Sequence, residues 1–260
     1  LMRRQRQMCI RDRYKNKGKF SLINSLSILD RPGEYCFLLN KNGGGRLYLW
    51  PLKFSAEGPP NITVSVRPYG FELAGNSFVI IQGFKIQKQS GYQAAAIYNR
   101  QPVSFLVIRK CEITKVCSQR RSGAILLNNV SYSLIDSNYI YRNPHCAGLM
   151  LYQYNYSIVS NNLLRKNGST GVDYYNCHHS KLLYNTVLDN RGVHANGLTM
   201  YAGCSDILVK GNKVFNSNTC LTLQDAREIT IINNIFDGHN EEMCIGLWSG
   251  PPLINIRIFN

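Results

Sequence analysis

A short phrase recurs along the second half of the chain, and its period limits the available folds more than any other feature. The phrase joins alternating apolar residues to an asparagine, as in SLIDSNYI, SIVSNNLL and ITIINNIF. The asparagines are Asn138, Asn162, Asn185, Asn212 and Asn234, spaced 24, 23, 27 and 22 residues apart. FVIIQGFKI and FLVIRKCEI extend the register upstream, with Phe84 and Cys111 in place of asparagine. An internal repeat of this length indicates a repeat architecture.

A second phrase runs in step with the first, in the forms AGLMLY, TGVDYY, NGLTMY, TCLTLQ and MCIGLW. Period-2 alternation in short segments rich in Val, Ile, Leu and Tyr predicts strands, and no helical pattern separates them. Leucine-rich repeats of similar length need their own consensus, and propeller blades need about 40 residues. The repeat therefore predicts a parallel β-helix, whose turns of three short strands stack about 4.8 Å apart.

Stacking places equivalent residues of successive turns in columns. The five asparagines then form a ladder of side-chain amides inside one corner, where they satisfy buried backbone groups from turn to turn. We assign these asparagines a structural role.

The residues of the second phrase alternate between the interior and the exterior of the helix. One outward column holds Met150, Asp173, Thr199, Thr222 and Gly246, and its neighbour holds Tyr152, Tyr175, Tyr201, Gln224 and Trp248. The first column contains a single carboxylate, Asp173. The aromatic residues of the second column predict either a surface on which sugar rings stack or an aromatic stack that stabilises the sheet.

The asparagine-marked repeat resembles the right-handed parallel β-helix superfamily of pectate lyases, polygalacturonases, alginate and chondroitin lyases and epimerases. The resemblance covers residues 75–260. Upstream, DRPGEYCFLLNKNGGGRLYLWP predicts a strand, a glycine-rich turn and a strand, and is similar to the segment that precedes the helix in many bacterial carbohydrate-active members. Leu39 and Asn40 depart from that pattern, since many relatives carry an acidic residue there. We expect an all-β, right-handed parallel β-helix of about seven turns, preceded by a β-hairpin segment over residues 14–74.

Both ends of the chain are expected to be non-native boundaries. The stretch RRQRQMCIRDR, from Arg3 to Arg13, resembles a translated adapter of transposon-based sequencing libraries, so residues 1–13 are expected to form a non-native arm without specific contacts. The final INIRIFN repeats the beginning of ITIINN and stops inside a turn. We therefore expect a fragment that is truncated at both ends.

The chain is basic, with 30 Lys and Arg against 15 Asp and Glu. Without residues 1–13 it keeps 25 basic against 14 acidic side chains. A basic surface attracts nucleic acid, anionic membrane or acidic polysaccharide alike, and no run of 18 apolar residues suggests a membrane span. Eight cysteines follow the arm without a CxxC pair, which indicates buried free thiols.

The resemblance implies a substrate groove along the second-phrase strands. A lyase or epimerase acting on uronates needs a cation beside the carboxylate, a base for the C5 proton and a proton donor. We predict catalytic roles for Asp173, His194, Tyr201, Lys166 and Arg191, with the two cations near substrate carboxylates and His194 or Tyr201 as base. Substrate-binding roles are predicted for Tyr152, Tyr175, Trp248, Thr199 and His178. No metal site is predicted, because His145 and His194 lie two turns apart, about 9.6 Å.

Two other functions stay open. A glycoside hydrolase needs paired carboxylates about 5–9.5 Å apart, and Asp189, Asp225, Glu241 and Glu242 lie in flanking turns without a paired motif. A non-catalytic glycan-binding protein, such as an adhesin or tailspike, shares the fold. The resemblance implies an extracellular or periplasmic monomer that binds an anionic polysaccharide, and neither nucleic acid nor membrane. It implies no certain cofactor and leaves a Ca²⁺ requirement open.

Overall fold

The computed structural model describes residues 29, 32, 35–39, 45–50, 65–118, 122–192, 194–238, 243–248 and 250–260. The chain divides into two compact units, residues 1–64 and 65–260. The arm expected over residues 1–13, and the expectation that it makes no contacts, lie outside the described residues, as do Glu241 and Glu242.

The described part of the first unit is a β-hairpin. Its strands are β1 (Tyr35–Leu39) and β2 (Gly45–Leu49). They pair antiparallel, with Tyr35 opposite Leu49 and Leu39 opposite Gly45. The two strands predicted from the sequence are thus confirmed, and the glycine-rich turn predicted between them lies outside the described residues.

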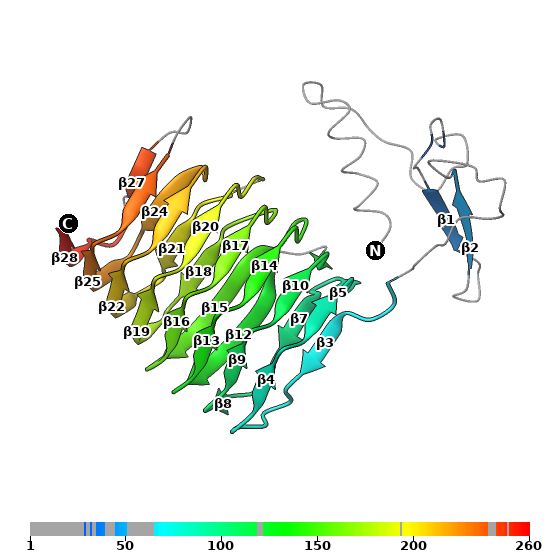
Figure 1. Cartoon of the computed structure of the whole chain (residues 1–260), viewed down its shortest axis with the longest axis horizontal. Helices are drawn as coiled ribbons and strands as arrows, with labels where there is room; N and C mark the ends of the chain where they lie inside the picture. The colour runs from blue at the N-terminus through cyan, green and yellow to red at the C-terminus, as the bar shows by residue number, and fades with distance from the viewer. Residues whose placement is uncertain are drawn as a thin grey trace. The chain divides into compact units, whose positions relative to one another are not determined.

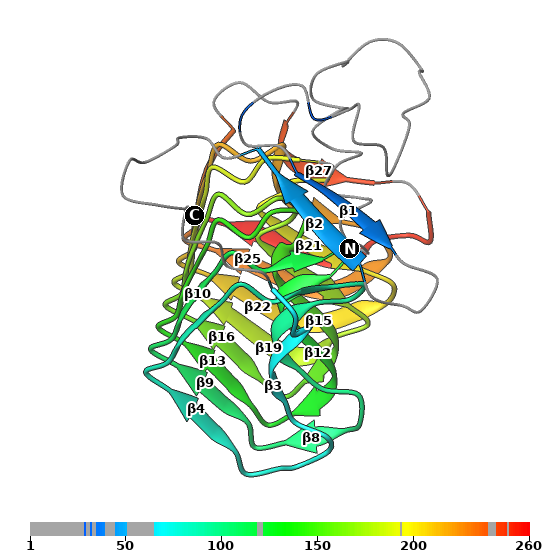
Figure 2. The same cartoon turned by 90° about the vertical axis from the view of Figure 1, so that its right-hand side faces the viewer.

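The second unit is a solenoid of about eight turns, in which three sheets run side by side along its length (Figures 1 and 2). The first sheet contains β3 (Tyr69–Glu72), β7 (Ala95–Tyr98), β12 (Gly123–Ser131), β15 (Ala147–Asn155), β18 (Val172–Tyr175), β21 (Leu198–Tyr201), β24 (Thr219–Leu223) and β27 (Met243–Leu247), with β8 (Val103–Ser104) beside β12. The second contains β4 (Ile80–Gln82), β9 (Val107–Arg109), β13 (Leu134–Asp136), β16 (Ile158–Ser160), β19 (His178–Leu183), β22 (Cys204–Lys210), β25 (Ala226–Ile232) and β28 (Ile254–Phe259). The third contains β5 (Lys85–Gln87), β10 (Glu112–Thr114), β14 (Tyr139–Tyr141), β17 (Leu163–Arg165), β20 (Thr186–Leu188), β23 (Lys213–Phe215) and β26 (Ile235–Asp237). Two short strands, β6 (Ser90–Gly91) and β11 (Cys117–Ser118), pair separately.

Each strand pairs in parallel with its equivalents one turn before and one turn after. In the first sheet, for example, Leu149 lies opposite Val172 and Val172 opposite Leu198. The parallel β-helix predicted from the repeat is therefore confirmed, with about eight turns against the seven expected. No helix long and apolar enough to cross a membrane occurs among the residues that the structure describes.

The interior of the solenoid is filled by one apolar cluster that runs through all three sheets. The inward residues of the second phrase, such as Leu149, Leu151 and Val172, belong to it and are buried. Seven cysteines in the described residues are free and buried, and Cys244 is free and exposed. Each turn thus contributes a layer of apolar side chains that its neighbours cover.

Corners between the sheets are formed by residues with left-handed backbone angles. We call the corner between the first and second sheets the first corner, that between the second and third sheets the second corner, and that after the third sheet the third corner. Tyr156 (φ 51°), Asn161 (φ 54°) and Lys166 (φ 55°) occupy these three corners in a single turn. A residue in the left-handed conformation bends the chain sharply from one sheet to the next. That conformation costs roughly 1–2 kcal/mol when the residue is not glycine. Other interactions must offset that cost in every turn.

The predicted asparagine column lies directly after the second corner and forms a continuous hydrogen-bonded ladder. The Nδ2 of Asn138 donates to Oδ1 of Asn162 at 2.9 Å, and the Nδ2 of Asn162 donates to Oδ1 of Asn185 at 2.9 Å. Asn185, Asn212 and Asn234 continue the series at 3.0 Å. After Asn138, each Oδ1 also accepts the backbone N–H of the preceding asparagine, as from Asn162 to Asn185 at 3.0 Å, and Oδ1 of Asn138 accepts the N–H of Cys111 at 3.0 Å. The ladder therefore joins five turns at their buried corner groups.

A second asparagine ladder, which the sequence analysis missed, follows the third corner. The Nδ2 of Asn143 donates to Oδ1 of Asn167 at 2.9 Å, and the backbone N–H of Asn167 donates to Oδ1 of Asn190 at 3.0 Å. Each of these residues stands five positions after an asparagine of the first ladder. That spacing is the signal that could have identified them.

The small residue that opens the second phrase is explained by close packing. A Cβ atom on Gly148, Gly171 or Gly197 would lie 2.5, 2.4 or 2.2 Å from a side-chain carbon of the third sheet, on Leu164, Val187 and Val214 respectively. These positions therefore keep the first sheet close to the third.

Replacing Asn185 by alanine should destabilise the solenoid strongly. The substitution leaves the buried N–H of Asn162 and the carbonyl of Val159 without their side-chain partner. We expect a loss of about 2–4 kcal/mol in the free energy of unfolding, measured by chemical denaturation. Lys181→Ala, at an exposed position of β19, is the matched control and should change it by less than about 0.5 kcal/mol.

Tyr174→Phe should stabilise the protein. The Tyr174 side chain is fully buried, and its hydroxyl has no hydrogen-bond partner among the described residues. Removing an unsatisfied buried hydroxyl should raise the free energy of unfolding by about 1 kcal/mol. Tyr154→Phe is the control: it removes the hydrogen bond from the Tyr154 hydroxyl to the Ile158 carbonyl at 3.3 Å, and should lower that free energy. Equal effects of the two substitutions would contradict the explanation.

Candidate functional site

The outward face of the first sheet carries the predicted aromatic column. Tyr152, Tyr175 and Tyr201 lie opposite one another on β15, β18 and β21. The rings of Tyr152 and Tyr175 are stacked, with centroids 4.8 Å apart and planes 22° apart, whereas Tyr201 is tilted by 57° to Tyr175 at 5.4 Å. Because stacked rings cover each other's faces, Tyr152 and Tyr175 offer mainly their edges to a ligand. Trp248, two turns beyond Tyr201, is 46% exposed.

The neighbouring outward column is buried. Asp173, Thr199 and Met150 are 0–2% exposed. Met150 belongs to a small apolar cluster outside the main core, with Leu126 and with Tyr152 packed against it. Asp173, predicted as a catalytic carboxylate, therefore lies below the surface and lines neither of the two hollows described next.

One hollow of about 460 Å³, which we call the tyrosine hollow, opens beside the tilted Tyr201. It is lined by Tyr175, His194, Tyr201, Ala202, Gln224, Asp225 and Pro251. The loop that carries His194 is fixed from the preceding turn, where the Thr170 hydroxyl donates to the His194 carbonyl at 2.7 Å. An imidazole, a phenol and a carboxyl group thus meet in one concavity, a combination suited to proton transfer.

A second hollow of about 620 Å³, the basic hollow, lies at the third corner. It is lined by Arg142, Pro144, Lys166, Asn167, Gly168, Asp189 and Arg191. Its only lining carboxylate among the described residues, Asp189, accepts hydrogen bonds from Asn216 Nδ2 at 3.1 Å and Arg165 Nε at 3.2 Å. The Asn216 amide, followed by Arg165 and the charge of Lys166, holds the pKa of the Asp189 carboxyl below its ordinary value. Three cations therefore surround one carboxylate that already has partners.

The residues predicted for one catalytic centre are distributed over both hollows. Tyr201 and His194 line the tyrosine hollow, whereas Lys166 and Arg191 line the basic hollow. Arg191 and His194 stand three positions apart on the same loop. Asp225, weighed in the sequence only as a flanking carboxylate, lines the tyrosine hollow.

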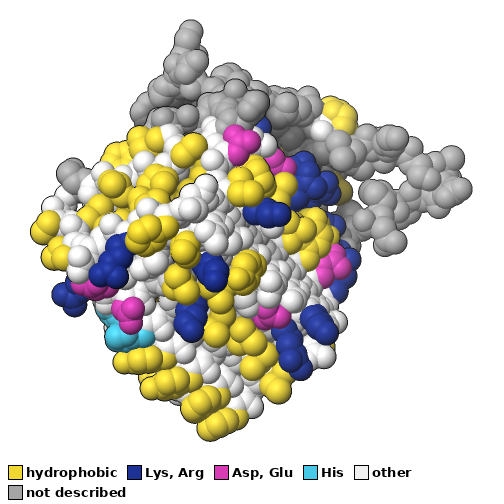
Figure 3. Space-filling view, turned by 60° about the vertical axis from the view of Figure 1, so that its left-hand side comes forward, with side chains coloured by type: hydrophobic (Ala, Val, Ile, Leu, Met, Phe, Trp, Pro, Cys, Tyr) yellow, Lys and Arg dark blue, Asp and Glu magenta, His cyan; other side chains and the backbone are white. Residues whose placement is uncertain are grey.

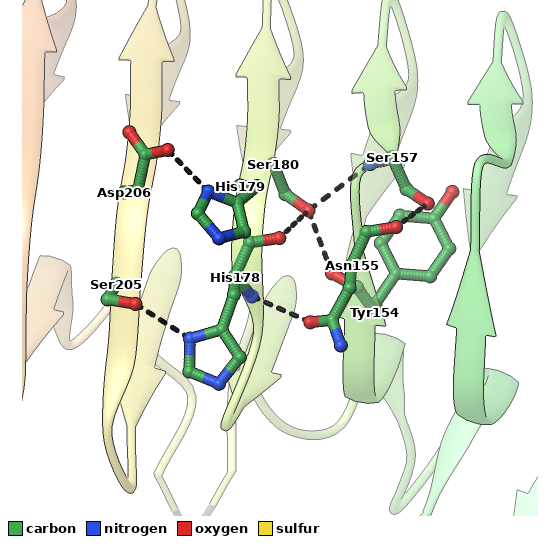
Figure 4. A network of polar contacts seen from close by, with 8 residues as sticks. All are labelled: Tyr154, Asn155, Ser157, His178, His179, Ser180, Ser205 and Asp206. Atoms are coloured by element: carbon green, nitrogen blue, oxygen red, sulfur yellow. Dashed lines mark hydrogen bonds and ion pairs between the residues drawn. The ribbon is translucent and has the colours of Figure 1, made fainter.

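His178, predicted to bind substrate, lines neither hollow and takes part in a polar network at the first corner (Figure 4). Its Nδ1 lies 2.7 Å from the Ser205 hydroxyl, and its Nε2 lies 3.0 Å from Oδ1 of Asn176. An amide oxygen only accepts hydrogen bonds, so these contacts fit a neutral imidazole with its proton on Nε2. Burial, and then the charges of His179 and Arg227, lower the pKa of His178.

A second aromatic series, absent from the sequence predictions, runs along the first corner. Its members are Phe78, Phe105, Tyr132, Tyr156 and His179, with neighbouring centroids 4.6–5.5 Å apart and planes 13–17° apart. Figure 3 shows a row of hydrophobic side chains at one edge of the molecule, with histidine beside it. Neighbouring rings cover each other's faces, so this series stabilises the corner and leaves ring edges exposed.

Metal ligands do not gather at either hollow. No group of three His, Cys, Asp or Glu side chains that could hold a metal ion occurs within the described ranges.

The fold and its repeat are characteristic enough to assign a family. The sequence profile described as the right-handed beta helix region matches residues 69–251, most of the chain. The chain belongs to the right-handed β-helix family. A search of curated proteins by sequence found no match.

Solved structures of the same fold resemble this family member. The crystal structure of the periplasmic alginate epimerase AlgG superposes with a TM-score of 0.58 at 15% sequence identity, over 74% of this chain and 47% of that chain. Two mutants of AlgG give TM-scores of 0.57 and 0.59 at 16% identity, with the same coverage. The chain thus spans about half the length of AlgG, and at this identity the likeness is one of fold.

The lowered pKa of His178 predicts a pH dependence of stability. A pKa that is lower in the folded state than in the unfolded state means that folding favours the neutral imidazole. His178 therefore contributes stability that is present above the unfolded pKa of about 6.5 and is lost as the pH falls through the folded value. NMR titration of the imidazole signals should place the pKa of His178 below 6.5. Titration at or above that value would contradict the assignment.

Proposed function

We propose that this β-helix protein acts on an acidic, uronate-containing polysaccharide as a lyase or an epimerase, with the tyrosine hollow as its reaction site. The observation that carries the proposal is the meeting of His194, Tyr201 and Asp225 in that hollow, beside the tyrosine column of the first sheet. Concave sites with a few convergent titratable groups are the usual reaction sites of enzymes.

The proposed reaction begins with removal of the proton at C5 of a uronate. Imidazole is the commonest general base in enzymes, so His194 takes this proton, with Tyr201 as the alternative base. In a lyase the electron pair left at C5 forms the C4=C5 double bond while the C4–O bond breaks and the leaving oxygen is protonated. In an epimerase a proton returns to C5 from the opposite side. Both routes build negative charge on the uronate carboxyl, which a cation beside that carboxyl stabilises.

Charge and fold support an acidic sugar polymer. Outside residues 1–13 the chain carries 25 basic against 14 acidic side chains, and Arg191 stands three positions before His194 on the same loop. AlgG, whose fold this chain resembles, is described as an alginate epimerase and as periplasmic. We therefore propose a substrate of the polyuronate class and a location outside the cytoplasm.

The geometry favours this chemistry over hydrolysis by paired carboxylates. Within the described residues, Asp225 is the only carboxylate that lines the tyrosine hollow, and Asp173 is fully buried. A glycosidase needs two carboxyl groups on either side of the scissile bond.

His194→Ala and Tyr201→Phe should each lower turnover of polymannuronate or polygalacturonate at least 100-fold, because each removes a proton-transfer group. Tyr152→Ala should instead raise KM with little change in kcat, because Tyr152 lies a turn away from the hollow lining. Lyase turnover is followed by the absorbance of the new double bond, and epimerisation by deuterium uptake at C5 in heavy water. Release of reducing ends without a double bond would indicate a hydrolase, and binding without turnover would indicate a non-catalytic protein. Full activity of both His194→Ala and Tyr201→Phe would place the reaction elsewhere.

A further inference from the structure

The third corner carries cations on four successive turns. Each of these cations directly follows a strand of the third sheet and has a φ angle between 51° and 67°. They are Lys88, Lys115, Arg142 and Lys166. The strands they follow, β5, β10, β14 and β17, are paired neighbours. The four cations therefore form a column along the axis of the solenoid, at the turn spacing of about 4.8 Å. The next two turns carry Asp189 and Asn216 at this position.

The backbone beneath this column is held in place by the second asparagine ladder. Arg142 and Lys166 directly precede Asn143 and Asn167, which are buried and hydrogen-bonded to each other. Lys115 precedes Val116, whose N–H donates to Oδ1 of Asn143 at 3.0 Å. The side chains of Lys115, Arg142 and Lys166 are exposed, and no ion pair of theirs occurs among the described residues. Charges on a fixed backbone are thus left available to solvent.

At its end the column opens into the basic hollow. Arg142 and Lys166 line the hollow together with Arg191, which comes from the following turn. The Asp189 carboxylate in the same wall is engaged by Arg165 and Asn216. A row of cations that ends in a concave site is an arrangement for binding several linked anions.

We propose that the third corner is a docking strip for the carboxylates of a linear anionic polysaccharide, running along the solenoid axis and distinct from the tyrosine hollow. The proposal rests on the proposed function for the class of polymer. A polyuronate carries one carboxylate on each sugar, so its charges repeat along one line, as the cations of the corner do. The strip would hold the polymer outside the reaction site and raise its local concentration there.

The lining favours a sugar polymer over the other polyanions that bind basic surfaces. Proteins that bind single-stranded nucleic acid combine cations with aromatic side chains on which bases stack, and none of the described residues that line the basic hollow is aromatic. Among the described residues, the apolar lining consists of Pro144 and the stems of long side chains, which offers few apolar side chains for insertion into a membrane.

The test compares two triple variants that remove equal charge. One variant combines Lys115→Gln, Arg142→Gln and Lys166→Gln, which removes three of the four cations of the column and leaves Lys88. Lys181→Gln, Lys210→Gln and Lys213→Gln together remove three cations from the second and third sheets, outside both hollows. Binding of sodium alginate is measured by calorimetry at several salt concentrations, with dextran and single-stranded DNA as the neutral and nucleic-acid probes.

We expect the strip variant to bind alginate at least tenfold more weakly than the unaltered chain and with a weaker salt dependence. The control variant should change the affinity less than twofold, and dextran should not bind the strip. Equal losses in both variants would mean that net charge alone attracts the polymer and would overturn the proposal. Tighter binding of DNA than of alginate, lost in the strip variant, would overturn the choice of polymer. Since binding is measured without turnover, an inactive protein whose alginate affinity still depends on the strip would refute the proposed reaction and leave the strip established.

Discussion

The structure depends on hydrogen bonds that cross from one turn to the next inside the corners. Strand pairing satisfies the backbone of the three sheets, but at each corner the chain changes direction and its buried N–H and carbonyl groups lose their strand partners. The two asparagine ladders supply the missing partners. One side chain such as Asn162 accepts from the turn before and donates to the turn after it. Because each asparagine inside a ladder hydrogen-bonds to the turn before it and to the turn after it, the corners of successive turns stabilise one another.

The corner geometry also determines which side chains are exposed at the surface of the solenoid. A left-handed residue projects its side chain away from the core, while the residue after it points inward and joins a ladder, as Lys166 and Asn167 do. The outer positions therefore lie outside the packed core and repeat at the turn spacing. Aromatic rings occupy this position along the first corner and cations along the third. A solenoid of this kind presents its surface as parallel rows of similar side chains, which suits ligands that are themselves repetitive.

The fold could be predicted from the sequence because the asparagines that mark the repeat are the same residues that form the first ladder. The same reading could have found the second ladder, since Asn143, Asn167 and Asn190 recur with the same period. The candidate site could be predicted only in part. Alternation places Asp173 on the outward side of β18, but alternation carries no information about what covers that side, and the carboxyl group is buried. The separation of Lys166 from Tyr201 into different hollows depends on the loops between the third and first sheets, whose lengths do not repeat.

The two hollows are connected through a single stretch of chain, and this connection limits how the site can work. Arg191 reaches the basic hollow and His194 the tyrosine hollow from one loop. That loop is anchored on both sides, by the Arg191 N–H to the Asn167 carbonyl at 3.1 Å and by the Thr170 hydroxyl to the His194 carbonyl at 2.7 Å. An anion bound by Arg191 therefore holds the backbone segment that positions His194. If the proposed polyuronate is long enough to occupy both hollows, it contacts this loop at Arg191 and at His194, whereas a single sugar contacts it at only one of them. Under the proposed function, the length of the polymer therefore decides whether both hollows can be occupied at once.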